Sequence, residues 1–293
     1  MITVRLMGGL GNQMFQFAAG RALALRRGVP LRLDLGWFAD QPPQDTPRAY
    51  ELHVFALDDE VDKAVVPLPE PRTRLQLARA RLADALRRSP NVIRQRGPGF
   101  DPAVLDAPDG AHLVGYWQSE RYFADAAAVL RGHDFQPRAP LGADAARIRD
   151  EIAAAPGAVS VHVRRGDYLT NPHAQRYHGV LGVDYYARAV EIVAQRAAQP
   201  RLFVFSDDPD WCAANLDLGV PATIVGPGEG RAAWEDMLLM SACRHHVIAN
   251  SSFSWWGAWL APGDDAVVVA PERWVLDPSD DFSAVYAAGW VRA

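Results

Sequence analysis

The sequence predicts an α/β protein built from two doubly wound parallel sheets, and three observations lead to this fold class. Short apolar runs alternate with helical spacings along most of the 293 residues, which is typical of strand–helix–strand units. One complete unit fits within the first 35 residues. A stretch rich in proline and glycine, 131–142, interrupts the alternation, which then restarts. We therefore expect two Rossmann-like domains, 1–140 and 141–293.

The first unit consists of a strand over 2–7, a helix over 12–27 and a strand over 29–35. Apolar residues recur at helical spacing between Met14 and Leu25, and Gly28 follows as a C-terminal cap. Further on we expect irregular loop over 40–70, strands over 112–117, 158–163, 202–205, 247–249 and 266–270, and helices over 72–88, 143–155, 184–195, 234–243 and 254–260.

Composition excludes several classes of protein. The net charge of -5 argues against nucleic acid as the partner, because binding to its backbone needs a broad basic surface. The two cysteines, Cys212 and Cys243, form neither a disulfide framework nor a zinc motif. The sequence lacks a signal-peptide pattern and any apolar run of about 18 residues. We expect a cytoplasmic protein.

One segment, Arg72–Arg96, is strongly basic. It holds eight arginines against one acidic residue, Asp84. Such a segment forms either a solvated helix face or a basic surface that contacts anionic lipid. The second reading predicts peripheral contact with the inner face of the membrane, or with an acceptor carried on it.

Polar clusters follow four of the predicted strands, at 8–13, 164–168, 206–210 and 250–254. Ligands of doubly wound sheets bind at the carboxyl ends of the strands. Four such clusters therefore predict one ligand site.

The stretch VSVHVRRGDYL, 159–169, ends a strand with two arginines. Arg164 at the strand end has the geometry to grip a phosphate with two parallel hydrogen bonds and to stabilise a departing diphosphate. Arg165 alternates to the other face, where it is expected to pair with Asp167. The alternative is a purely structural network of arginines and aspartates.

The stretch GGLGNQMFQ resembles a phosphate-binding turn before a helix, but Met14 replaces the third glycine of a dinucleotide fingerprint and no Gly-Lys-Ser/Thr follows. Gly9 and Gly11 permit close backbone approach to a ligand. Asn12 is expected to cap the helix, to point its amide into the site, or both.

The stretch FSDDPDWC contains the pair Asp208-x-Asp210, which two readings explain. The pair matches the Asp-x-Asp pattern of a motif that binds a divalent metal ion. The proline between the two acids favours a helix start instead, and we expect no metal site.

The stretch WEDMLLMSACRHHVIANSSFSWWGAWL is the richest in candidate residues. Asp236 has the acceptors to bind the N1–H and N2–H edge of guanine, or it is an exposed surface acid. Ser252 and Ser254 lie at a strand-to-helix junction, where hydroxyl and N–H groups suit phosphate or cap the helix. The three tryptophans are expected in the core rather than beneath a sugar, and both histidines are expected to be structural.

Together, GGLGNQMFQFAAGRALA, HVRRGDYL, FSDDPDWC and NSSFSWWGAWL resemble glycosyltransferase family 11, the bacterial α-1,2-fucosyltransferases. The resemblance implies a GT-B fold, two Rossmann-like domains facing across a cleft. It implies metal-independent, cofactor-free, inverting transfer of L-fucose from GDP-β-L-fucose. The implied acceptor is the 2-hydroxyl of a galactoside in an oligosaccharide or an O-antigen unit.

The same resemblance implies roles for individual residues. Arg164 would bind the β-phosphate and His162 the nucleoside. Asp236 would bind guanine. Ser252 and Ser254 would contact the donor phosphates, and Asn12 would reach the reactive centre. The general base is left open: Asp167 ranks first, with His173 and His178 as alternatives.

Three other functions compete with this one. A fucosyltransferase of different linkage would share the HxRRxD motif, which here is residues 162–167, and a non-catalytic nucleotide-sugar binding protein would keep Arg164 and Asp236. An oxidoreductase that uses NAD(P) is disfavoured by the broken glycine fingerprint.

Overall fold

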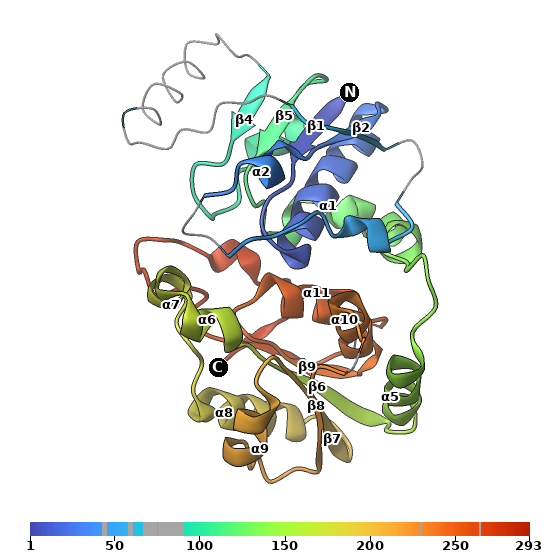
Figure 1. Cartoon of the computed structure of the whole chain (residues 1–293), viewed down its shortest axis with the longest axis vertical. Helices are drawn as coiled ribbons and strands as arrows, with labels where there is room; N and C mark the ends of the chain where they lie inside the picture. The colour runs from blue at the N-terminus through green and yellow to red at the C-terminus, as the bar shows by residue number, and fades with distance from the viewer. Residues whose placement is uncertain (43–45, 58–60, 67–74, 76–90, 229, 264) are drawn as a thin grey trace. The chain divides into compact units, whose positions relative to one another are not determined.

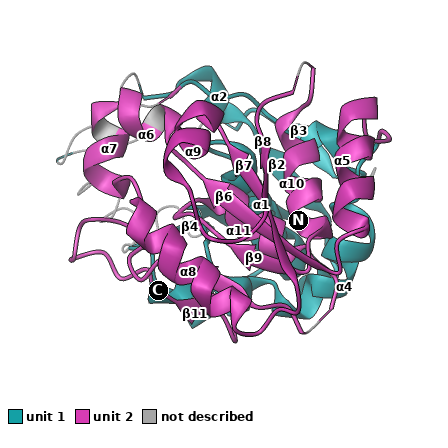
Figure 2. Cartoon of the chain, turned by 90° about the horizontal axis from the view of Figure 1, so that it is seen from below, with its two compact units in different colours: residues 1–43, 47–138, 283–285 teal, residues 44–46, 139–282, 286–293 magenta. Residues whose placement is uncertain are grey.

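The computed structural model describes residues 1–42, 46–57, 61–66, 75, 91–228, 230–263 and 265–293, without the side chains of Asp167 and His173. The chain divides into two compact units, which Figure 2 colours separately. Unit 1 comprises Met1–Pro43, Pro47–Arg138 and Ser283–Val285, and unit 2 comprises Gln44–Thr46, Ala139–Phe282 and Tyr286–Ala293.

Unit 1 contains a five-stranded sheet in the order β3-β2-β1-β5-β4, and every pairing in it is parallel. The chain order reverses between β1 and β5, so polar groups that follow these two strands lie at the switch point of the sheet. The strands are β1 (Ile2–Arg5), β2 (Leu31–Asp34), β3 (Asp62–Ala64), β4 (Val92–Arg94) and β5 (His112–Val114). The helices are α1 (Leu10–Arg27), α2 (Gly36–Ala39) and α4 (Ala127–Val129), with a π-helical turn at Leu130–Asp134.

Helix α1 packs on β1 and β2 along most of its length (Figure 1). A Cβ atom at Gly20 would come within 2.9 Å of Val4 Cγ1, so the missing side chain lets the helix lie this close to β1. The helix ends at Gly28, whose φ of 63° is left-handed and whose N–H donates to the last carbonyls. This confirms the predicted cap.

Unit 2 contains a six-stranded parallel sheet in the order β11-β10-β9-β6-β7-β8. Counted from its own first strand this is the order 6-5-4-1-2-3, the doubly wound arrangement with its switch point between β6 and β9. The strands are β6 (Gly157–Val163), β7 (Pro200–Ser206), β8 (Ala222–Val225), β9 (His245–Val247), β10 (Val268–Ala270) and β11 (Val291–Arg292). The helices are α5 (Ala143–Ala153), α6 (Gly166–Thr170), α7 (Pro172–His178), α8 (Val183–Ala194), α9 (Pro209–Asn215), α10 (Ala233–Ala242) and α11 (Ser252–Trp259).

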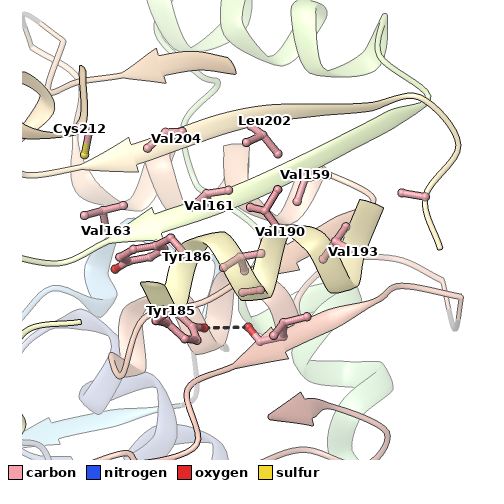
Figure 3. Close-up of a cluster of buried hydrophobic side chains, with 14 residues drawn as sticks. Val159, Val161, Val163, Tyr185, Tyr186, Val190, Val193, Leu202, Val204 and Cys212 are labelled. Atoms are coloured by element: carbon pink, nitrogen blue, oxygen red, sulfur yellow. Dashed lines mark hydrogen bonds between the residues drawn. The ribbon is translucent and has the colours of Figure 1, made fainter. Parts of the chain in front are cut away.

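Helices cover both faces of this sheet, with α8 and α9 on one side and α5, α10 and α11 on the other (Figure 1). Figure 3 shows the apolar core beneath α8, where the valines of β6 and side chains of β7 contact Tyr186, Val190 and Val193. The Tyr185 hydroxyl reaches Ile248 O at 2.5 Å and so ties α8 to the end of β9.

Several sequence-based bounds need correction. β9 lies two residues earlier than expected, and the segment expected as loop over 40–70 contains β3. β4, β8 and β11 were not expected at all. The helix expected over 72–88, and most of the basic segment Arg72–Arg96, lie outside the described residues. Within the described part of the chain, no helix has both the length and the hydropathy needed to cross a bilayer.

Candidate active site

Three polar clusters of unit 2 lie at the carboxyl ends of neighbouring strands, as the sequence predicts. Arg164 follows β6, Asp207 follows β7 and Asn250 follows β9. β6 is the middle strand of the three, and its last residue, Val163, pairs with Ser206 at the end of β7. The switch point between β6 and β9 is the place where a doubly wound sheet binds ligands. The candidate site is therefore centred on Arg164.

Two arginines at this edge are held by two aspartates. Arg164 Nη1 lies 2.8 Å from Asp207 Oδ2, and the backbone N–H of Arg165 donates to Asp207 Oδ1 at 2.9 Å. The Arg165 guanidinium pairs with Asp208 at 3.0 Å and lies over the Trp211 ring. Arg165 thus has a structural role, with Asp208 as an acidic partner. The expected pairing with Asp167 stays a prediction, because the Asp167 side chain lies outside the described residues.

Asp208 begins helix α9. Its carboxylate accepts a hydrogen bond from the backbone N–H of Trp211 at 3.2 Å, which makes it the N-cap. The helix-start reading of FSDDPDWC is confirmed. In the described part of the chain, no three His, Cys, Asp or Glu side chains are grouped to hold a metal ion.

His162 lies on the face of β6 opposite its valines. The ring is buried, and its centroid lies 5.6 Å from that of Phe253 in α11. Burial, with the Arg164 charge adding to it, lowers the pKa of His162 to about 3, so the ring is neutral at physiological pH. Its Nδ1 is buried without a hydrogen-bond partner among the described residues. A buried polar atom without a partner is costly, and a ligand contact would satisfy it.

Helix α11 starts at the same edge of the sheet. Ser251 is its N-cap and accepts from the Phe253 N–H at 3.3 Å. Ser252, the first helical residue, is half-buried. Ser254 is buried, and its hydroxyl lies 3.2 Å from both Ala249 O and Ser251 O. The phosphate roles of Ser252 and Ser254 stay predictions, and of the two Ser252 is the more accessible.

The tryptophans of α11 form part of the core, as expected. Trp255 and Trp256 are fully buried, and Trp259 stacks on Trp255 at a centroid distance of 5.9 Å. The two histidines of β9 are structural: His246 Nδ1 lies 2.8 Å from Ser160 Oγ inside the core, and His245 Nδ1 accepts from the Val267 N–H.

Helices α6 and α7 form a segment beside Arg164 that is fixed to the end of β9. The Tyr168 hydroxyl donates to Asn250 O at 3.0 Å, and Asn250 Nδ2 donates to His178 O at 2.9 Å. The rings of Tyr168 and His178 stack at 4.8 Å. This segment carries the candidate bases. Asp167 lies in α6 and His173 in α7, but their side chains lie outside the described residues.

Asp236 lies in the first turn of α10, after β8. Its carboxylate is half-buried and accepts from Arg231 Nε at 2.6 Å. Burial raises its pKa, and Arg231 opposes the rise. Asp236 is therefore not the exposed surface acid of the alternative reading. Its role toward guanine stays a prediction.

In unit 1, Asn12 lies at the switch point between β1 and β5. Helix α1 starts at Leu10 with Gly9 as N-cap, so Asn12 does not cap it, contrary to one of the two readings. Instead, Asn12 Oδ1 accepts from Gln118 Nε2 at 2.8 Å. Gly9 and Gly11 flank the start of the helix: the Arg48 guanidinium lies beside Gly9, and Gly11 is buried.

Sequence reasoning missed Arg231 and the specific role of Asp207. Asp207 was one of three acids in a cluster, and only the register of β6 and β7 distinguishes it. Arg231 is a single arginine in the loop GPGEGR. Its position just before the helix predicted over 234–243 was the one available signal.

Comparison with known proteins assigns the family. The family model described as Glycosyl transferase family 11 matches residues 100–293. An alpha-1,2-colitosyltransferase of Escherichia coli is 34% identical over 282 residues, which cover 94% of this chain and 92% of the relative. The human galactoside alpha-(1,2)-fucosyltransferase 1 is 38% identical over 108 residues, covering 36% of this chain and 29% of that protein.

A solved structure confirms the fold class. The crystal structure of the alpha-1,6-fucosyltransferase NodZ, soaked with GDP-fucose, matches with a TM-score of 0.52 at 15% identity, covering 89% of this chain and 92% of that one. At this identity the likeness shows the fold alone, which is the GT-B fold of two parallel-sheet units. Together with the family match over residues 100–293 and the relative that covers 94% of this chain, these findings show that the chain is a member of glycosyltransferase family 11.

Proposed function

We propose that this glycosyltransferase moves L-fucose from GDP-β-L-fucose to the 2-hydroxyl of a galactoside. The observation that carries the proposal is the position of Arg164 and the N-terminus of α11 after β6 and β9, the two strands that flank the switch point. An arginine and a helix N-terminus together suit a diphosphate. Family membership and the names of the relatives supply the linkage.

The donor would bind through unit 2. Arg164, Ser252 and the first N–H groups of α11 would hold the diphosphate. His162 would contact the nucleoside with its unpartnered Nδ1, and Asp236 would accept from the guanine N1–H and N2–H. Asp207 holds one side of the Arg164 guanidinium. This contact orients the N–H groups on the other side before the sugar nucleotide binds.

The reaction would be a single in-line displacement. The acceptor O2 attacks C1 of fucose, the bond from C1 to the β-phosphate oxygen breaks, and GDP leaves with inversion from β to α. A base takes the proton of the acceptor hydroxyl. Arg164 and the N-terminus of α11 would balance the charge that develops on the diphosphate, without a metal ion or other cofactor.

The general base would lie on the α6–α7 segment. Asp167 is our first candidate because it follows Arg164 by three positions, and His173 and His178 are the alternatives. The pairing of Arg165 with Asp208 favours Asp167, because Arg165 already has a carboxylate partner. Asn12 would contact the reacting groups from its place at the start of α1.

The test measures GDP release from GDP-fucose in the presence of EDTA, with and without lactose or N-acetyllactosamine. Release should be stimulated by the acceptor and should fall about 100- to 1000-fold in Arg164→Ala. Arg188→Ala, which removes an exposed arginine of α8, is the matched control and should be unaffected. Release that is unchanged in Arg164→Ala contradicts the assigned role of Arg164.

A second donor is favoured by the full-length relative named as a colitosyltransferase. Colitose is 3-deoxy-L-fucose, so the two donors differ by one hydroxyl. A site that hydrogen-bonds the 3-hydroxyl discriminates strongly against the deoxy sugar, whereas an apolar site does not. Comparing kcat/KM for GDP-fucose and GDP-colitose decides between the two. A preference for GDP-colitose would replace fucose as the transferred sugar.

We also propose a cytoplasmic location with peripheral membrane contact through Arg72–Arg96. The proposed membrane contact rests on the charge of this segment alone. The chain should bind vesicles that contain anionic lipid, and reversal of Arg79, Arg81 and Arg87 should abolish the binding. Absence of binding by the native protein rejects the proposal.

A further inference from the structure

Arg231 is a buried cation in the loop between β8 and α10. Its side chain is 3% exposed and has three acceptors: Asp236 Oδ1 at 2.6 Å from its Nε, the Asp144 carboxylate of α5, and Gly226 O. A buried arginine with a different acceptor on each nitrogen is fixed in orientation. Arg231 therefore joins the loop to α5 and to the first turn of α10.

The loop folds closely around this guanidinium. A Cβ atom at Gly228 would come within 2.7 Å of Arg231 Nη1 and 2.6 Å of Asp144 Oδ2, so a side chain at this position would displace the guanidinium or the carboxylate. Glu235 fixes the start of α10 from the other side, since its carboxylate accepts from the N–H groups of Ala232 and Gly142. The geometry around Arg231 is thus held from both ends.

Asp236 is held by this arrangement in one orientation. Arg231 binds Oδ1, and among the described residues no further hydrogen-bond donor reaches the carboxylate. The side chain is 26% exposed, so a ligand has access to it. Each carboxylate oxygen accepts two hydrogen bonds, so Oδ1 remains able to accept from a ligand beside Arg231. An oriented carboxylate that is paired with an arginine and has unused acceptor sites suits a pair of neighbouring N–H donors.

We propose that Arg231 is a positioning residue for base recognition. It pairs with the Asp236 carboxylate and orients it so that it accepts from the N1–H and N2–H of guanine, and it thereby sets the preference for guanine nucleotides. The proposal rests on the proposed function, in which the donor is a GDP-sugar. Arg231 itself does not touch the reacting atoms.

The experiment compares the affinity of the full chain for GDP and IDP, measured as competitive inhibition of transfer and by calorimetry. Hypoxanthine in IDP lacks the 2-amino group, so the ratio of the two affinities reports the contact to N2–H. The native protein should prefer GDP by about tenfold or more, the ratio expected for a hydrogen bond to a charged group. Asp236→Asn should lower the ratio to near one.

Two substitutions at Arg231 test its positioning role. Arg231→Gln should lower the GDP/IDP ratio to about that of Asp236→Asn. Arg231→Lys keeps the charge but cannot reach three acceptors at once, and should give an intermediate ratio. Arg244→Gln removes an arginine from an exposed pair with Asp265 in the same unit and should keep the native ratio. A cooperative thermal transition identifies folded variants, and the lysine variant suffices if the glutamine variant is unfolded.

Two results overturn the proposal. In the first, folded Arg231→Lys and Arg231→Gln keep the GDP/IDP affinity ratio of the native protein, while Asp236→Asn lowers that ratio to near one. In the second, the native protein has a GDP/IDP affinity ratio near one and still turns over GDP-fucose. Asp236 then does not bind the guanine 2-amino group, although the transferase assignment stands. Failure of the proposed function itself is distinct, since neither GDP binding nor turnover would then be seen.

Discussion

The Asp207 carboxylate binds two consecutive arginines by different groups: the Arg164 guanidinium with one oxygen and the Arg165 backbone N–H with the other. The two contacts fix both the path of the chain after β6 and the direction of the Arg164 side chain. The side chains of Asp207 and Arg164 are both partly exposed to solvent, so their ion pair contributes less than about 1 kcal/mol to stability. Its main effect falls on the orientation of Arg164.

Asp207→Asn should therefore reduce kcat more than stability. The amide keeps the size of the side chain but loses the charge that holds Arg164. We expect kcat to fall about 10- to 100-fold, the range for a misplaced positioning contact. The control is Asp210→Asn, which changes an exposed acid three residues further on. Equal kcat in both variants would show that Asp207 does not orient Arg164.

Alanine at Gly8 should disturb Asn12 as well as the backbone. Gly8 has φ of 72°, and a Cβ there would lie 2.7 Å from Asn12 Nδ2. We expect Gly8→Ala to lower turnover as far as Asn12→Ala does, and to destabilise the fold by about 1–2 kcal/mol. Gly28→Ala introduces the same left-handed strain with nothing within 4 Å, and should leave turnover unchanged. Full activity of Gly8→Ala would separate Asn12 from catalysis.

The tryptophans of α11 should affect stability and not acceptor binding. Trp256 is fully buried, and its ring packs edge-on against those of Trp255 and Trp259 at centroid distances of 4.9 and 5.1 Å. Trp256→Ala should cost about 3–5 kcal/mol in unfolding free energy. Trp256→Phe should stay folded with an unchanged KM for the galactoside. A raised KM at unchanged melting temperature would instead indicate that the ring contacts sugar.

Stability should fall as the pH drops below about 6.5. Burial lowers the pKa of His162 and of His246 to about 3, with Arg164 and His245 as the respective second causes, while the unfolded chain titrates near 6.5. Between these values the unfolded state binds more protons, so acid favours it. Each histidine contributes a slope that rises to about 1.4 kcal/mol per pH unit once the unfolded histidine is fully protonated, below about pH 5.5.

Urea unfolding at about pH 7, 6 and 5 measures this slope. His246→Gln should make it shallower by about 1 kcal/mol per pH unit on average over this range, whatever its effect on absolute stability. Asp34 does not contribute in this window. Burial raises its pKa, but hydrogen bonds from His112, the Val66 and Gly36 N–H groups and Arg5 lower it to about 2, so its share is lost only below about pH 4. An equal slope in both proteins contradicts the prediction.

Much of the sheet framework could be predicted because its elements carry strong local signals. The 3.6-residue spacing and the glycine cap identify α1, and the apolar run of β6 identifies the centre of the second sheet. The strands that were missed are short and lie toward the edges of the sheets. β3 has two exposed residues of three, and β4 is only half-buried, so neither shows an apolar pattern. Their pairing depends on neighbours distant in sequence.

The site was predictable in composition but not in its contacts. Arg164 and the serines of α11 could be found because they follow buried strands. The choice of Asp207 for Arg164 and Asp208 for Arg165 depends on the parallel register of β6 and β7, which no local pattern encodes. Arg231 could not be assigned, since its three acceptors come from α5, α10 and the loop itself.

The attachment of the α6–α7 segment has a consequence for altering this enzyme. Tyr168 and His178 bind opposite ends of the segment to the same residue, Asn250, and the stacking of their rings brings those ends together. A length of chain closed at its base in this way is a cassette. The residues from 169 to 176 can be exchanged for those of a relative while both anchors and the sheet stay unchanged. Chimaeras made at these boundaries would exchange the middle of this segment, including His173, between members of the family, while Asp167 and His178 stay in place on the scaffold.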